Sequence, residues 1–153
     1  MEMMLQPNAW SCLPTAAAMV LGVEPRIVIE YLQHDGSDIM FEQLPEPLCR
    51  QGFHLQEIVD CFLHVGIIPV YIEAMVTYSD PLNINVKVHQ ESERRFKDYL
   101  SKHSGILLGQ HKSGVDHAVA WSPHDNPDSL VFDPRGDKYP ISEFNIEGAL
   151  LCF

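Results

Sequence analysis

The chain has 153 residues, with 10 Lys and Arg against 21 Asp and Glu, so its formal net charge is −11. Hydrophobic residues make up 46% and charged residues 20%, which is typical of a globular protein and excludes a largely disordered chain. Nucleic-acid binding needs a basic surface that displaces phosphate counterions, so we expect neither nucleic acid nor an anionic membrane as a partner. The length predicts a single domain over residues 1–153.

Targeting signals and paired cysteines are both absent from the sequence pattern. The longest uncharged apolar stretch, near residues 16–23, is too short to span a bilayer, which takes about 20 residues. The N-terminal residues MEMMLQPNAW do not form the basic region of a secretion signal, so we expect a cytoplasmic protein. No two cysteines have C-x-x-C spacing, which excludes a zinc ribbon or a thioredoxin motif. We therefore expect four free thiols, at Cys12, Cys49, Cys61 and Cys152.

The first half of the chain is predicted to be mainly helical. A helix is expected over Ser11–Leu21, with Pro14 in its first turn, where a missing N–H costs nothing, and Gly22 as its stop. Apolar residues at 55, 58, 59, 62 and 63 have helical spacing and predict a later helix. The predicted helices cover residues 11–21, 26–33 and 54–65, with a proline-containing loop over 44–52.

The second half of the chain is predicted to be mainly strands. Residues 67–75 are rich in β-branched side chains, and further short apolar runs occur after residue 105. One amphipathic surface helix is expected over 91–102, after a loop over 79–90. The predicted strands cover residues 67–75, 106–110, 117–122, 130–132 and 149–153, with a hairpin link over 123–128. Helices followed by an antiparallel sheet indicate an α+β fold.

Cys12 is the first candidate for chemistry, because it lies where the first predicted helix begins. Unpaired backbone N–H groups and the positive end of the helix dipole stabilise a thiolate at such a position, and the thiolate is the nucleophilic form of cysteine. Gln6 precedes Cys12 by six residues, so a short loop could fold its amide back beside the sulfur. The side-chain NH₂ of Gln6 and the backbone N–H of Cys12 could then stabilise an oxyanion.

His117 and Asp133 are the matching candidates in the second half of the chain. His117 opens a predicted strand of small apolar residues, and Asp133 ends the next strand. If these two strands form a hairpin, the two side chains become neighbours, and the carboxylate can orient the imidazole as a general base. The sequence therefore predicts a Cys12–His117–Asp133 triad with Gln6 as an oxyanion donor.

In this order and spacing the chain resembles the papain-like superfamily of cysteine peptidases, and most closely its C39-like branch, which is related to bacteriocin-leader peptidases. The resemblance lies in Gln6-x5-Cys12, in the small-residue helix over 16–22, and in the two segments Gly114-x-x-His117-Ala118-Val119 and Phe132-Asp133-Pro134. It implies a papain-like α+β fold in which an N-terminal helical half carries the nucleophile and packs on an antiparallel sheet.

The resemblance also implies a function and a role for each site residue. Cys12 would be the nucleophile, His117 the general base and acid, Asp133 the residue that orients His117, and Gln6 the oxyanion donor. The expected activity is hydrolysis of peptide bonds in a peptide or protein substrate, without a cofactor or metal. A small stand-alone peptidase would suit a phage or a bacterial system, and its oligomeric state stays open.

Three alternatives remain open from the sequence. The same triad could perform other acyl transfers, as an amidase or a transglutaminase-like enzyme. The domain could also be an inactive peptidase relative that binds a peptide without cutting it. Finally, His111, His117 and His124, together with Asp116 or Asp133, could form a metal site of nitrogen and oxygen ligands, although they match no common metal-binding spacing.

Overall fold

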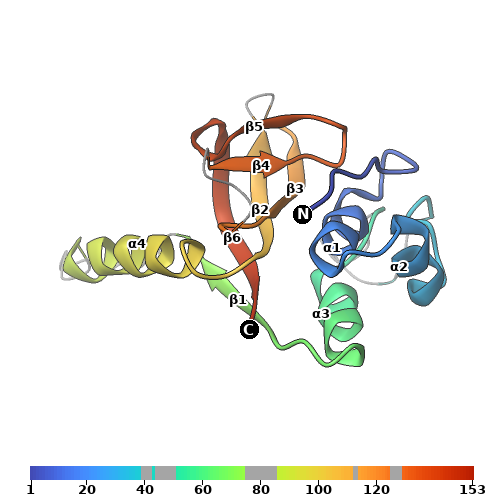
Figure 1. The fold of residues 1–153 in the computed structure, drawn as a ribbon, viewed down its shortest axis with the longest axis horizontal. Coiled ribbons are helices and arrows are strands. Elements are labelled where there is room, and N and C mark those ends of the chain that lie inside the picture. The colour runs from blue at the N-terminus through green and yellow to red at the C-terminus, as the bar shows by residue number, and fades with distance from the viewer. Residues whose placement is uncertain (39–42, 44–50, 75–85, 112–113, 125–128) are drawn as a thin grey trace.

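The structure is a computed structural model that describes residues 1–38, 43, 51–74, 86–111, 114–124 and 129–153, with the backbone alone for residues 86–92. It combines α-helices with an antiparallel sheet (Figure 1), so the expected α+β class is confirmed. The predicted loops over 44–52 and 79–90 and the link over 123–128 lie partly outside the described residues, and Cys49 lies outside them entirely.

The three N-terminal helices form where the sequence predicts them. They are α1 (Cys12–Leu21), α2 (Pro25–Leu32) and α3 (Leu55–His64). Gly22 ends α1 in a left-handed conformation, with φ 69°, that costs glycine no steric strain. Among the described helices, none alone is long and apolar enough to cross a membrane; α1 and α2 meet that criterion only as a pair and are bent by 119°.

The described strands form one six-stranded sheet in the order β1-β6-β2-β3-β4-β5, and neighbouring strands are all antiparallel. Along the chain the strands are β1 (Pro69–Glu73), β2 (Gly105–His111), β3 (Asp116–Trp121), β4 (Leu130–Phe132), β5 (Lys138–Pro140) and β6 (Phe144–Cys152). The 3-10 turn η1 (Ile141–Glu143) precedes β6.

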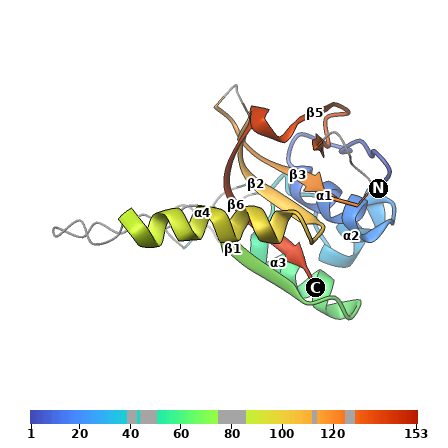
Figure 2. The same cartoon turned by 60° about the vertical axis from the view of Figure 1, so that its left-hand side comes forward.

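Helices cover both faces of this sheet, because alternate strand residues point to opposite sides. On one face, Ala118 and Ala120 of β3 pack with the core residues of α1, α2 and α3. On the other face, Val119 and Trp121 pack with Phe96 from helix α4 (Val86–Leu100). Figures 1 and 2 show α1–α3 gathered on one side of the sheet and α4 lying across the other.

Three elements differ from the sequence-based expectation. Helix α4 begins at Val86 rather than at residue 91, so the predicted loop over 79–90 is wrong for its last five residues. Strand β6 begins at Phe144 rather than at residue 149; its first residues alternate between apolar and polar, which is a strand pattern. Strand β5 was not predicted, since it has only three residues and ends in a proline.

Candidate active site

Cys12 is the first residue of α1, and a compact loop leads into it. The side-chain oxygen of Asn8 accepts the backbone N–H of Trp10 at 2.9 Å. The Ser11 side chain is fully buried. Its hydroxyl donates to the carbonyl oxygen of Asn8 at 3.2 Å and accepts the backbone N–H of Asn8 at 3.3 Å. The Asn8 side-chain amide also donates to the carbonyl oxygen of Asp35 at 3.0 Å. These contacts hold Cys12 at the helix N-terminus, half-buried, where the sequence places it.

His117 and Asp133 come together because β3 and β4 pair as antiparallel neighbours. Nε2 of His117 lies 2.7 Å from Oδ1 of Asp133, so the imidazole N–H donates to the carboxylate. Both side chains are almost fully buried, with exposed fractions of 2% and 4%. The contact is therefore shielded from water, in which a charged pair is much weaker.

The thiol of Cys12 reaches the same imidazole. Its side chain is hydrogen-bonded to His117, and because Nε2 faces Asp133, the ring nitrogen left for sulfur is Nδ1. Burial alone would raise the pKa of the Cys12 thiol, but the hydrogen bond and charge of His117 outweigh it. Backbone hydrogen bonds at Ala118 and Leu13 add to this effect, so the thiol pKa is below its ordinary value.

The pKa of His117 moves in the opposite direction. Burial disfavours the charged ring, but its hydrogen bonds to Asp133 and Cys12 and their negative charge raise the pKa to about 9. A lowered thiol pKa beside a raised imidazole pKa favours the thiolate–imidazolium pair over the neutral thiol and imidazole. The arrangement can therefore supply a nucleophile and a proton donor near neutral pH.

Three donors hold the Asp133 carboxylate, and two of them were missed from the sequence. Oδ1 accepts the backbone N–H of Arg135 at 2.8 Å in addition to His117, and Oδ2 accepts the Tyr139 hydroxyl at 3.1 Å. Burial would raise the Asp133 pKa, but these hydrogen bonds and the charge of His117 keep it below its ordinary value. Tyr139 could not be found from the sequence because β5, which carries it, was not predicted.

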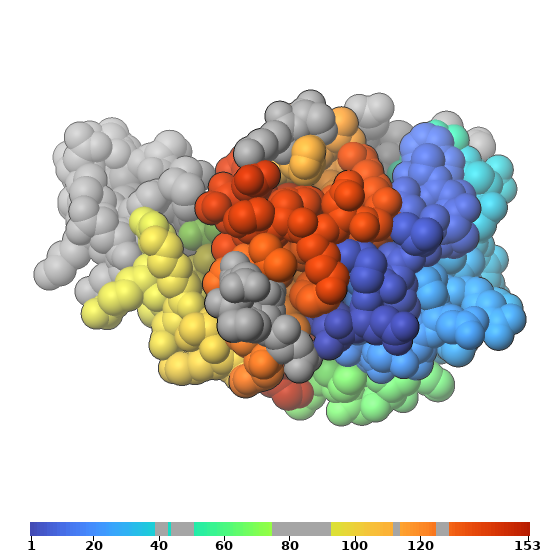
Figure 3. All heavy atoms as spheres, turned by 45° about the horizontal axis from the view of Figure 1, so that its top comes forward, coloured from blue at the N-terminus to red at the C-terminus, as the bar shows by residue number. Residues whose placement is uncertain are grey.

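Gln6 is hydrogen-bonded to the turn that follows Asp133. Its backbone N–H donates to the carbonyl oxygen of Pro134 at 2.8 Å. The neighbouring Leu5 side chain packs against Gly136, where an added Cβ would come within 2.8 Å of it. Figure 3 shows the N-terminal residues in blue against the C-terminal strands in orange and red. Among the described residues, the buried Oε1 atom of Gln6 has no hydrogen-bond partner, so this amide is not used in a structural contact through its oxygen.

The histidines of the alternative metal site do not gather. His124 lies 3.2 Å from the carbonyl oxygen of Lys102 on the exposed surface, and the His111 ring packs edge-on against Tyr139 at 5.3 Å. In the part of the chain that the structure describes, no three His, Cys, Asp or Glu side chains are placed to hold a metal ion. The side chains considered from the sequence as metal ligands are therefore not grouped as such in the described part of the chain.

The other described cysteines differ from Cys12 in environment. Cys61 is buried in α3, and burial raises its thiol pKa. Burial also raises the pKa of Cys152, at the end of β6, to about 11. Both thiols are therefore held in the poorly nucleophilic protonated form at neutral pH.

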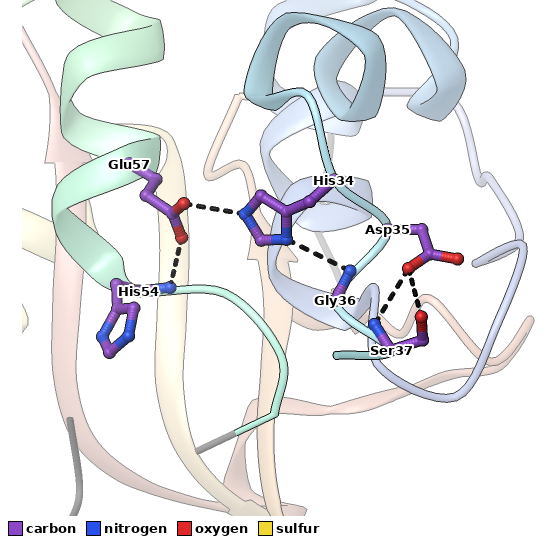
Figure 4. Close-up of polar contacts among 6 residues, drawn as sticks. All are labelled: His34, Asp35, Gly36, Ser37, His54 and Glu57. Atoms are coloured by element: carbon purple, nitrogen blue, oxygen red, sulfur yellow. Dashed lines mark hydrogen bonds and ion pairs between the residues drawn. The ribbon is translucent and has the colours of Figure 1, made fainter. Parts of the chain in front are cut away.

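A second histidine–carboxylate pair lies at the start of α3 (Figure 4). Nε2 of His34 is 2.8 Å from Oε1 of Glu57, whose other oxygen accepts the backbone N–H of His54 at 2.7 Å. Nδ1 of His34 accepts the backbone N–H of Gly36 at 3.2 Å, and the ring stacks on Phe53. This pair joins the loop after α2 to the N-terminus of α3.

Neither a scan against models of known protein families nor a search of curated proteins found a match to this chain.

Proposed function

We propose that the protein is a cysteine peptidase of papain-like fold, which hydrolyses peptide bonds with Cys12 as nucleophile. One observation carries the proposal. His117 is hydrogen-bonded to the Cys12 thiol and to the Asp133 carboxylate, and the pKa values of the thiol and the imidazole are shifted in opposite directions. Covalent acyl-transfer chemistry needs this arrangement, in which the nucleophile is hydrogen-bonded to the base and the base to an orienting acid.

The first half-reaction breaks the peptide bond. The Cys12 thiolate attacks the carbonyl carbon, a C–S bond forms, and the π electrons move onto the carbonyl oxygen. The backbone N–H of Cys12 at the helix N-terminus and the side-chain amide of Gln6 donate to this oxyanion. The C–N bond then breaks as His117 gives its proton to the leaving nitrogen, and a thioester remains on Cys12.

The second half-reaction restores the site. His117, now neutral, takes a proton from a water molecule, whose oxygen attacks the thioester carbon. The C–S bond breaks and returns the electron pair to sulfur, so thiolate and imidazolium are both regenerated. Asp133 stays ionised and keeps Nε2–H of His117 hydrogen-bonded throughout, which leaves Nδ1 for the reacting atoms.

The papain-like assignment is supported by the placement of the triad on the two halves of the fold. The nucleophile begins a buried helix of small residues, and that helix packs on β3, which carries the base. The acid follows the next strand, β4. The same order of residues along the chain is the one by which the sequence resembles the papain-like peptidases.

The decisive experiment measures thiol reactivity against pH in the intact protein. Iodoacetamide is applied briefly from pH 4 to pH 10, and the extent of labelling at each cysteine is read by peptide mass spectrometry. Cys12 should be labelled well below pH 8, because its thiolate is stabilised by His117. Cys152, whose thiol pKa is about 11, is an internal control that should be labelled only at alkaline pH.

Turnover is then tested with a peptide library and the Cys12→Ala variant. Wild-type protein should release new peptide termini, and Cys12→Ala should release none while keeping its fold, since only a small side chain is lost. Activity should survive EDTA and be lost to iodoacetamide, because thiolate chemistry needs no Lewis acid. Cleavage by Cys12→Ala, or labelling of Cys12 and Cys152 at the same pH, would contradict the proposal.

A further inference from the structure

We propose that Tyr139 is a positioning residue of the active site: its hydroxyl holds the Asp133 carboxylate in the orientation in which it directs His117 toward Cys12. This inference rests on the proposed function. It adds a fourth member to the hydrogen-bonded series, which then runs from Tyr139 through Asp133 and His117 to Cys12.

The carboxylate of Asp133 needs an external constraint because its own torsion supplies little. The terminal torsion of an aspartate side chain is broad and roughly two-fold, so its plane is set by hydrogen bonds and not by the covalent geometry. Oδ1 already accepts two donors, the imidazole of His117 and the backbone N–H of Arg135. The Tyr139 hydroxyl is the donor to Oδ2, so it resists rotation of the carboxylate about its Cβ–Cγ bond.

The fold places this hydroxyl by pairing two short strands. Tyr139 of β5 lies opposite Val131 of β4, and Val131 precedes Asp133 by two residues. The turn between the strands is closed by two backbone hydrogen bonds: the Asp133 N–H donates to the carbonyl oxygen of Asp137 at 2.9 Å, and the Gly136 N–H donates to the carbonyl oxygen of Asp133 at 2.9 Å. The short strand β5 therefore has a definite consequence for the site, which is to bring one phenol to the buried carboxylate.

The charged surroundings of Tyr139 are consistent with a hydrogen bond donor that stays protonated. Burial and the negative charge of Asp133 raise the Tyr139 pKa, Asp137 acts in the same direction, and Arg135 acts against them. The His111 ring contacts the Tyr139 ring edge-on at 5.3 Å and helps to hold it. The phenol therefore donates to Asp133 over the whole range in which a thiolate–imidazolium pair can exist.

The Tyr139→Phe variant tests this role, because it removes one oxygen and keeps the ring and its contact with His111. Loss of the hydroxyl removes the donor that Oδ2 has among the described residues, so the carboxylate rotates and His117 loses its fixed direction. The pH range over which the protein turns over substrate, measured as kcat/KM, should narrow from both sides, because protonation of the Cys12 thiolate limits it at acid pH and loss of the His117 proton limits it at alkaline pH. The acid limb should move up and the alkaline limb down, each by about half to one pH unit, the effect of one hydrogen bond. Turnover should fall by about tenfold.

A control and a second measurement separate this role from simpler ones. Tyr99→Phe removes the same oxygen from an exposed tyrosine on α4 and should leave both limbs unchanged. Thermal unfolding shows whether each variant is folded, and the ¹³C carboxyl signal of Asp133 should titrate at higher pH in Tyr139→Phe than in wild type.

The outcomes distinguish this inference from the proposed function. An unchanged profile in Tyr139→Phe would overturn the inference. So would an alkaline limb that moves upward alone, because the hydroxyl would then only weaken the charge of Asp133 without orienting it. If wild-type Cys12 itself is unreactive below pH 8, the proposed function fails first, and the carboxyl titration still reports whether Tyr139 acts on Asp133.

Discussion

Two histidine–carboxylate pairs of nearly equal length occupy different parts of this molecule. His117 and Asp133 are 2.7 Å apart, and His34 and Glu57 are 2.8 Å apart, in each case through Nε2 of the ring. The side chains of the first pair are 2% and 4% exposed, and those of the second are 16% and 24% exposed. The distance between ring and carboxylate therefore does not distinguish the candidate catalytic pair from a structural pair.

The two pairs differ in the group that the second ring nitrogen of each histidine contacts. Nδ1 of His34 accepts the backbone N–H of Gly36, so both nitrogens of that ring are used to join a loop to α3. The second nitrogen of His117 instead faces the Cys12 thiol, whose proton it can take. A histidine–carboxylate pair becomes chemically useful when its free nitrogen meets a group that can change protonation state.

The largest expected effect comes from removing each histidine in turn. His117→Ala should lower turnover by about 10⁴-fold, since it removes both the base and the positive charge that stabilises the Cys12 thiolate. His34→Ala should lower the free energy of unfolding by about 1–2 kcal/mol and change turnover little, because it loses a partly exposed hydrogen bond and its stacking on Phe53. Turnover rates and urea unfolding of both variants check this, and equal losses of turnover would contradict the distinction between the pairs.

The next effect separates attack from activation. In the proposed mechanism Gln6 donates to an oxyanion that exists only after attack, so Gln6→Ala should lower turnover by about 10²–10³-fold. It should leave the pH profile of Cys12 alkylation unchanged, because iodoacetamide forms no such oxyanion. Asp133→Ala is the matched comparison: it weakens the ion pair and should shift alkylation to higher pH. Equal alkylation shifts in the two variants would mean that Gln6 is not the oxyanion donor.

Local patterns in the sequence were enough to predict most elements of the fold and the residues of the candidate site. Helix α1 has a proline in its first turn and glycine after its end, and the position of Cys12 follows from that boundary. The neighbourhood of His117 and Asp133 follows from a single assumption, that two short strands pair. Whether these residues perform catalysis is a separate question, which the experiments above address.

The remaining features are contacts that no local pattern in the sequence encodes, whether the residues are close or distant along the chain. Tyr139 reaches Asp133 through a three-residue strand that has no periodicity of its own. Gln6 is tied to Pro134 by one backbone hydrogen bond across almost the whole chain. His34 and Glu57 are 23 residues apart and meet through the packing of α2 and α3. Each of these contacts is visible only after the fold has assembled.

The third effect is the pH dependence of turnover. The His117 pKa is raised from 6.5 to about 9, so the ring is protonated through neutral pH and loses its proton near pH 9. Turnover should therefore fall by about tenfold between the plateau and pH 10, because the leaving nitrogen loses its proton donor. The contribution of His117 to stability is complete below pH 6.5 and is lost as the pH rises through about 9, since its folded-state pKa is the higher one.

The Asp133→Ala variant tests whether His117 causes this alkaline decline in turnover. Without the hydrogen bond that His117 donates to Asp133, and without the charge of Asp133, the His117 pKa falls, so the alkaline decline should begin at lower pH than in wild type. A pH–rate profile of kcat/KM for the two proteins provides the measurement. An alkaline limb at the same pH in both would assign the limb to a group other than His117.

The smallest expected effect concerns the second pair alone. Glu57 accepts from His34 and from the backbone N–H of His54, and it lies in the first turn of α3, where a negative charge is favoured by the helix dipole. Glu57→Ala should lower the free energy of unfolding by about 1–2 kcal/mol, the usual cost of losing such a cap, and leave the alkylation profile of Cys12 unchanged. Glu30→Ala, on α2, is a control outside the pair and should lower the stability less. If Glu57→Ala shifted the alkylation profile as Asp133→Ala does, the His34–Glu57 contact would be coupled to the thiol, and the two pairs would no longer be independent.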